Sequence, residues 1–207
     1  MAKHIPLLLT LLRAGLAPVL VLLALFHPAP WAIAGCLILA VISDYFDGVI
    51  ARRLNIVTDN LRRLDSIADS LFYLAALFAA WWLYPDVIYG HLRPLAVLIG
   101  LELLRYVVDF ARFGREASYH LWSAKLWGVM LFLGFFALLV FAEDGLWVSL
   151  VIYWGILSDL EGLAISFVLR EWRTDVPTLA HALRLRRGVG PESRRSAQRT
   201  QRERRDP

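Results

Sequence analysis

The most regular feature of the chain is a series of long apolar stretches separated by short segments rich in proline, glycine or charge. A helix that crosses a membrane needs about 20 largely apolar residues. Breakers stand between the stretches, such as His-Pro-Ala-Pro at 27–30 and Glu-Asp-Gly at 143–145. The pattern predicts six membrane-spanning helices, at 6–26, 31–43, 66–84, 92–113, 126–142 and 146–169. The second stretch is short, and we expect it to continue through 44–53 as one helix that projects from the bilayer.

Composition supports this interpretation, because 58% of the 207 residues are apolar and eight are tryptophan. A soluble domain of this size has no interior large enough for so much apolar surface, so lipid must cover part of it. The sequence therefore predicts an all-α, polytopic integral membrane protein. Its one cysteine, Cys36, lies inside an apolar stretch and is interpreted as a small apolar filler.

Basic residues are distributed unevenly and set the expected orientation. They concentrate in the second and fourth connections and after Leu169, where half of the 22 Lys and Arg residues lie. Basic residues in short loops mark the cytoplasmic side, so both termini are predicted to be cytoplasmic. No cleavable signal peptide is recognisable, and the first stretch is expected to remain as a span.

The domain organisation follows from the same composition. Residues 1–187 are predicted to form one transmembrane catalytic domain. Residues 188–207 are rich in arginine and poor in large apolar groups, so we expect a disordered cytoplasmic tail. Its expected role is attraction to anionic headgroups rather than nucleic-acid binding.

Four aspartates lie between the second and third apolar stretches. Asp44 and Asp47 are three residues apart, and Asp65 and Asp69 are four apart, so each pair shares one helix face. Two antiparallel helices can point all four carboxylates at one centre, where they would repel one another unless cations neutralise them. Oxygen ligands select hard ions, so Mg²⁺ or Mn²⁺ is expected, with Ca²⁺ as a competitor. Two such ions would form a clamp suited to displacement at phosphorus.

The residues beside these aspartates suit a phosphorylated ligand. Gly48 and Ala51 leave one helix face bare, so that a bulky group can lie against the backbone. Arg52 can neutralise phosphate charge, and Thr58 can donate a hydrogen bond. The aspartate segment is therefore predicted to be a binding site as well as a metal site.

The segment resembles the signature of the CDP-alcohol phosphotransferase family, D-x2-D-G-x2-A-R-x8-G-x3-D-x3-D. Seven of its eight fixed positions match, namely Asp44, Asp47, Gly48, Ala51, Arg52, Asp65 and Asp69. The resemblance implies an enzyme of phospholipid synthesis that cleaves a CDP-linked lipid, releases CMP and joins the phosphatidyl group to a small alcohol. It also implies a homodimer.

The resemblance further implies a role for each matched residue. Asp44, Asp47 and Asp65 would hold two metal ions. Asp69 would lie in or near the metal shell and act as the general base for the acceptor hydroxyl. The CDP portion would be bound by Asp44, Gly48, Ala51, Arg52 and Thr58. Two positions depart from the pattern: Leu61 replaces the motif glycine, and Ser66 stands where many glycerophosphate-transferring members have proline.

The acceptor is predicted from the fourth connection. Arg112, Arg115 and Lys125 would receive an anionic acceptor, with glycerol 3-phosphate first and inositol phosphate second. His120 and Ser123 would supply hydrogen bonds. The positive-inside rule explains the same basic residues equally well, and Ser66 favours a serine-type acceptor instead.

Ionisable residues inside the spans leave two alternatives open. One is an ion- or proton-coupled transporter that uses acidic residues of the fourth and sixth spans, namely Glu102, Asp109, Asp159 and Glu161. The chain shows neither the internal repeats nor the broken helices that favour a transporter. The other alternative is a non-catalytic, metal-binding relative. Arg13, one or two turns inside the first span, is interpreted as reaching out to the cytoplasmic side.

Overall fold

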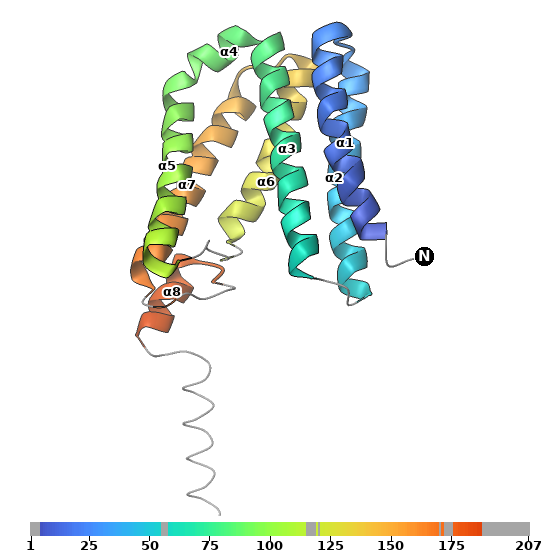
Figure 1. Cartoon of the computed structure of the whole chain (residues 1–207). Coiled ribbons are helices and arrows are strands. Elements are labelled where there is room, and N and C mark those ends of the chain that lie inside the picture. The colour runs from blue at the N-terminus through green and yellow to red at the C-terminus, as the bar shows by residue number, and fades with distance from the viewer. Residues whose placement is uncertain are drawn as a thin grey trace, which may run out of the picture. The chain divides into compact units, whose positions relative to one another are not determined.

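A computed structural model describes residues 5–54, 58–114, 119, 121–169, 171 and 176–187. The described residues form helices and no strand, which confirms the all-α prediction (Figure 1). The helices are α1 (Ile5–Phe26), α2 (Pro30–Arg53), α3 (Asp59–Leu83), α4 (Pro85–Gly90), α5 (Leu92–Phe113), α6 (Trp122–Phe141), α7 (Leu146–Val168) and α8 (Leu179–Arg186). The expected tail at 188–207 lies outside the described residues.

Five helices of the described part are long and apolar enough to cross a membrane: α1, α2, α6, α7 and the Arg63–Leu83 part of α3. The second span continues to Arg53 as one helix of 24 residues, as the sequence predicts. Helix α5 has 22 residues, but five charged residues interrupt its apolar sequence. Five spans are therefore supported by length and composition, and the predicted fourth span, at 92–113, is not confirmed.

Local sequence signals account for several helix ends. Pro30 and Pro85 stand at the first positions of α2 and α4, where the missing N–H costs nothing. The Thr58 side chain caps α3 by accepting a hydrogen bond from the backbone N–H of Leu61 at 3.2 Å. This cap fixes where α3 begins, and therefore on which turns of the helix Asp65 and Asp69 lie.

The chain divides into two compact units. The first contains residues 1–92 and 130–150, and in it α2 and α3 each pack against α1 (Figure 1). Helix α3 contributes a row of buried small side chains to this packing, namely Ala68, Ala75, Ala76, Ala79 and Ala80. In lipid no hydrophobic force drives helices together, so they associate through close packing. Small residues allow the helix backbones to approach closely enough for this.

Large apolar side chains also cover the outside of this unit. Leu8, Phe26 and Trp31 are 61%, 75% and 81% exposed. Such a surface is unstable in water and stable in lipid. Together with the apolar helices, it makes the chain a membrane protein.

The second unit contains residues 93–129 and 151–207. Its buried apolar cluster joins the ends of several helices and consists of Tyr119, Leu121, Ile165, Leu169, Val176 and Ala182. The Thr178 side chain caps α8 by accepting from the backbone N–H of His181 at 3.2 Å. In this short helix Ala182 is buried, whereas the basic residues Arg184 and Arg186 occupy the last turn.

Candidate functional site

The structure brings three of the predicted aspartates together. One carboxylate oxygen from each of Asp44, Asp47 and Asp65 lies within 4.8 Å of the other two. Asp44 and Asp47 come from the last part of α2, and Asp65 comes from the second turn of α3. Helical spacing on two neighbouring helices therefore produces the convergence that the sequence predicts.

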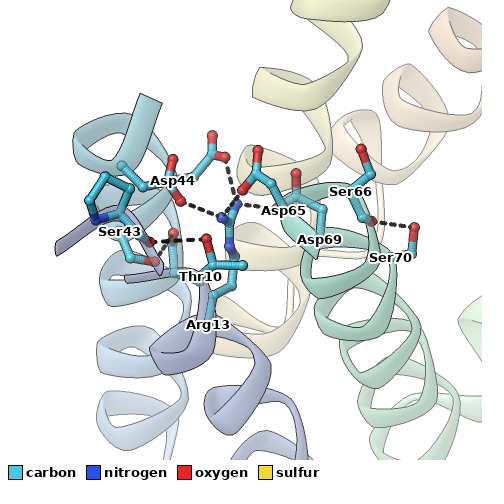
Figure 2. A network of polar contacts seen from close by, with 11 residues as sticks. Thr10, Arg13, Ser43, Asp44, Asp65, Ser66, Asp69 and Ser70 are labelled. Carbon is cyan, nitrogen blue, oxygen red and sulfur yellow. Dashed lines mark hydrogen bonds and ion pairs between the residues drawn. The ribbon is translucent and has the colours of Figure 1, made fainter. Parts of the chain in front are cut away.

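A positive charge from a third helix lies among these carboxylates. The side chain of Arg13 extends from α1 toward the aspartates of α2 and α3 (Figure 2). Nη1 pairs with Oδ1 of Asp44 at 2.5 Å and also with Asp69, whereas Nη2 pairs with Oδ2 of Asp47 at 2.7 Å and also with Asp65. Asp69, outside the compact triad, is thus joined to it through Arg13.

Arg13 does not place its charged group in solvent, as a side chain that reaches out of the membrane would. Arg13 is 1% exposed and is the largest fully buried side chain described. It pairs inward because a charge buried in an apolar environment is stable only beside opposite charge. One sequence signal could have revealed it: Arg13 is the only charged residue of an otherwise apolar helix, in a chain with four unpaired aspartates.

The charges of the site do not balance among the side chains that the structure describes there. Four carboxylates against one guanidinium leave a formal charge of −3, and Asp47 is only 5% exposed. Nε of Arg13 is buried with no hydrogen-bond partner. An oxygen-only donor set with excess negative charge fits a hard divalent cation such as Mg²⁺ or Mn²⁺.

Gly48 and Arg52 form a second feature of the α2 end. A Cβ added at Gly48 would lie 3.2 Å from Nη1 of Arg52 and 3.7 Å from its Cζ. The guanidinium therefore folds back over the bare backbone at Gly48, one turn away on the same helix face. Ala51 is buried at 6% exposure, so it packs within the first unit rather than facing open space.

The remaining residues near this segment have structural tasks. Thr58 is exposed, and its hydroxyl oxygen accepts the α3 cap hydrogen bond from Leu61. Its hydroxyl proton stays free to donate to a ligand. Leu61 is half-buried, and Ser66 is exposed and accepts a bond from the Ser70 hydroxyl at its carbonyl, at 2.9 Å. Figure 2 shows Ser66 and Ser70 on α3 beside Asp65 and Asp69.

The predicted acceptor residues belong to the second unit. The Arg112 guanidinium donates to the Leu169 carbonyl at 3.2 Å and lies 5.7 Å from the ring centres of Phe113 and Phe167. Lys125 is exposed, with Nζ 4.9 Å from the Trp122 ring centre. Arg115 and His120 lie outside the described residues. Arg112 and Lys125 thus already have local contacts.

The acidic residues of the predicted fourth and sixth spans are paired within the second unit. Arg105 donates to Glu102 at 2.8 Å and pairs with Asp159 at 3.1 Å. Ser123 donates to Glu161 at 2.6 Å, so Asp159 and Glu161 have different partners. Oε2 of Glu102 and Oδ2 of Asp159 remain buried without partners.

A polar chain lies beside this pairing. The Ser166 hydroxyl donates to Oδ1 of Asp109 at 2.5 Å, and its oxygen lies 3.0 Å from the Tyr119 hydroxyl. Burial raises the pKa of Tyr119, which keeps its phenol protonated and able to donate. These contacts join the segment between α5 and α6 to α7.

Comparison with known proteins shows which group of proteins shares this arrangement. The family model described as CDP-alcohol phosphatidyltransferase matches residues 3–160. A CDP-diacylglycerol–glycerol-3-phosphate 3-phosphatidyltransferase of Pectobacterium atrosepticum is 31% identical over 67% of this chain and 78% of its own length. Its namesake from Sodalis glossinidius is 34% identical over 50% of this chain and 57% of its own length. No solved structure matches the chain.

Proposed function

Because this chain belongs to the CDP-alcohol phosphatidyltransferase family, we propose that Asp44, Asp47, Asp65 and Asp69 form the metal site at which a CDP-linked lipid donor is cleaved. The chain is a transferase of phospholipid biosynthesis that moves a phosphatidyl group to an alcohol. The transporter alternative is not favoured. The observation that carries the proposal is the convergence of three carboxylates, within 4.8 Å, on a site with excess negative charge.

The reaction exchanges one phosphate ester bond for another. The acceptor hydroxyl oxygen bonds to the phosphorus of the phosphatidyl group, and the bond from that phosphorus to the bridging oxygen of the diphosphate breaks. CMP leaves with the bridging oxygen and its electron pair. Bound divalent ions, two in our proposal, would neutralise the charge that develops on the phosphate oxygens.

Asp69 is proposed as the base that removes the acceptor's proton. Its side chain is 37% exposed, more than that of Asp47 at 6%, so an acceptor can reach it. Arg13 contacts Asp69 and would keep its carboxylate oriented toward the centre of the cluster. A positioned base contributes roughly 10²- to 10⁴-fold to such reactions.

The donor's CDP portion is proposed to lie along the end of α2. Asp44 is 53% exposed at its side chain and stands at the edge of the cluster. The backbone at Gly48 is bare, and the Arg52 guanidinium folded over it can move to the diphosphate. The buried Ala51 would form the inner edge of this surface. The hydroxyl of Thr58, whose oxygen accepts the bond from Leu61, would donate its proton to the ligand.

The acceptor is proposed to be glycerol 3-phosphate, the acceptor in the names of the relatives. Arg112, Arg115 and Lys125 are proposed to bind its phosphate. Lys125 is exposed and accessible to an anion, whereas Arg112 would have to keep or exchange its bond to the Leu169 carbonyl. Inositol phosphate is the second candidate acceptor. Serine is the third, because Ser66 replaces the proline of many glycerophosphate-transferring members.

The membrane arrangement completes the proposal. We propose that α5, the predicted fourth span, also crosses the membrane, since its Arg105 pairs with both Glu102 and Asp159. We propose that the active site and both termini are cytoplasmic, which the basic residues of the connections support. The enzyme is proposed to work as a homodimer.

One experiment tests the reaction and names the acceptor. Purified protein in detergent, supplied with CDP-diacylglycerol and Mg²⁺, is incubated with glycerol 3-phosphate, inositol phosphate, serine or water alone. We expect CMP release that depends on glycerol 3-phosphate and forms a phosphatidylated product. CMP release with serine alone would replace the acceptor in the proposal, and no release with any alcohol would favour a non-catalytic relative.

A further inference from the structure

Arg13 contacts aspartates of two other helices, which the packing of α1 alone does not require. The neighbouring polar side chains of its environment bond within their own helices: Thr10 donates to the Pro6 carbonyl at 3.1 Å, and Ser43 donates to the Ala40 carbonyl at 2.7 Å. Arg13 instead reaches out of α1 to both other helices (Figure 2). It is therefore the residue through which α1 takes part in the acidic site.

The two ends of the guanidinium divide their contacts in the same way. Nη1 contacts one aspartate of α2, Asp44, and one of α3, Asp69. Nη2 likewise contacts Asp47 of α2 and Asp65 of α3. Each terminal nitrogen thus links the two helices that carry the carboxylates. A rigid planar fork can hold such a geometry, whereas a single ammonium cannot.

The same carboxylates cannot serve the guanidinium and divalent ions fully at once. Asp44, Asp47 and Asp65 are the group whose oxygens lie close enough to share a metal ion, and all three pair with Arg13. A guanidinium in this position repels an arriving cation and occupies its ligands. It also lowers the mutual repulsion of the carboxylates before any metal binds.

From this geometry we propose that Arg13 is the resident counter-cation of the site, a positioning residue that holds the four carboxylates together without metal and competes with divalent ions. The inference rests on the proposed metal site. Arg13 stabilises the metal-free protein and weakens metal affinity, so that ions exchange rather than remain permanently bound. The arginine and the metal are then coupled with opposite sign, and such couplings are typically about 5- to 150-fold in affinity.

Two substitutions separate this role from simple packing. Arg13→Met keeps an unbranched but shorter side chain without charge, and it should tighten Mn²⁺ binding at least about tenfold. Arg13→Lys keeps the charge but loses the fork, so its Mn²⁺ affinity should fall between those of wild type and Arg13→Met. The matched control is Arg105→Met, which removes an ion-paired arginine of the second unit that contacts none of the four aspartates.

The experiment titrates purified full-length protein in detergent with Mn²⁺ and measures free Mn²⁺ by electron paramagnetic resonance. Melting temperatures are recorded in parallel in EDTA and in saturating Mn²⁺. Arg13→Met should melt below wild type in EDTA, and the difference should shrink or reverse in Mn²⁺, because ligand binding stabilises the folded state. Arg105→Met should lower the melting temperature equally in both conditions.

Each outcome decides one point. Wild-type protein that binds Mn²⁺, with unchanged or weaker binding in Arg13→Met, would overturn the role of Arg13 and leave the metal site intact. Wild-type protein that binds no Mn²⁺ would overturn the metal site itself, and the Arg13 inference with it. If Arg13→Met does not fold, Arg13→Lys decides: affinity equal to or weaker than wild type contradicts the proposal.

Discussion

The guanidinium of Arg52 lies against the bare backbone of Gly48, where an added Cβ would come within 3.2 Å of Nη1. The neighbouring atom belongs to the flexible end of a long side chain, so a methyl group would displace it by a few tenths of an ångström at small cost. Gly48 is therefore not required for folding. In our proposal, the CDP portion of the donor uses the same space.

Gly48→Ala should separate stability from donor binding. Alanine stabilises a helix interior by about 0.5–1 kcal/mol relative to glycine, so the free energy of unfolding should not fall. The KM for CDP-diacylglycerol should rise, because the methyl group covers the surface proposed for CDP. Gly35→Ala is the matched control on the same helix, where an added Cβ meets nothing within 4 Å. Equal KM values in the two variants would remove Gly48 from the donor site.

Asp69→Asn should lower turnover and spare binding. The amide keeps the shape of the side chain but cannot accept the acceptor's proton, so kcat should fall roughly 10²- to 10⁴-fold. Binding of Mn²⁺ should change little, because Asp69 lies outside the compact carboxylate triad. Asp44→Asn should instead weaken Mn²⁺ binding directly. Unchanged kcat in Asp69→Asn would assign the proton transfer to another group or to water.

The double variant Arg112→Gln, Arg115→Gln tests the acceptor. The KM for glycerol 3-phosphate should rise about tenfold or more, since a charge-assisted hydrogen bond contributes about 1.5–3 kcal/mol. The KM for CDP-diacylglycerol should stay nearly constant. Arg53→Gln, at the end of α2, is the control for general loss of positive charge. If the acceptor KM does not move, these arginines serve topology and local packing, and a serine-type acceptor gains support.

Gly155→Ala tests the packing of the second unit. A Cβ at Gly155 would lie 2.7 Å from Nε1 of Trp127 and 2.8 Å from Cδ1 of Leu98, so the indole would have to leave its bond to the Val151 carbonyl. Overpacking of this kind costs about 1–3 kcal/mol. The melting temperature should fall, whereas Gly128→Ala, with open space around it, should show no such loss. An unchanged melting temperature in Gly155→Ala would contradict this packing.

The sequence predicted most features that depend on residue spacing within a single helix. The spans, the continuation of the second helix to Arg53 and the shared faces of the aspartate pairs follow from periodicity and spacing. Short helices were missed, because α4 and α8 have only six and eight residues and little periodicity. The fourth span, at 92–113, was predicted from length, but the charges of α5 leave it as a proposal.

The contacts of α1 with the aspartate site were the part that sequence could not supply. Arg13 is 31 residues from Asp44 and 56 from Asp69, and nothing in local spacing fixes which face of α1 meets α2 and α3. Its burial beside the aspartates was therefore not predicted. The pairing of Arg105 with Glu102 is local, at a spacing of three residues on one helix, whereas the contact of Arg105 with Asp159 joins α5 to α7.

The central claim is that the aspartates of α2 and α3 cleave the CDP-linked donor with the help of divalent ions. The most direct measurement is CMP release from CDP-diacylglycerol and glycerol 3-phosphate by protein stripped with EDTA, before and after Mg²⁺ is restored. We predict no release in EDTA, full recovery with Mg²⁺, and no recovery in Asp65→Asn. Release that persists in EDTA, or that recovers equally in Asp65→Asn, would contradict the claim.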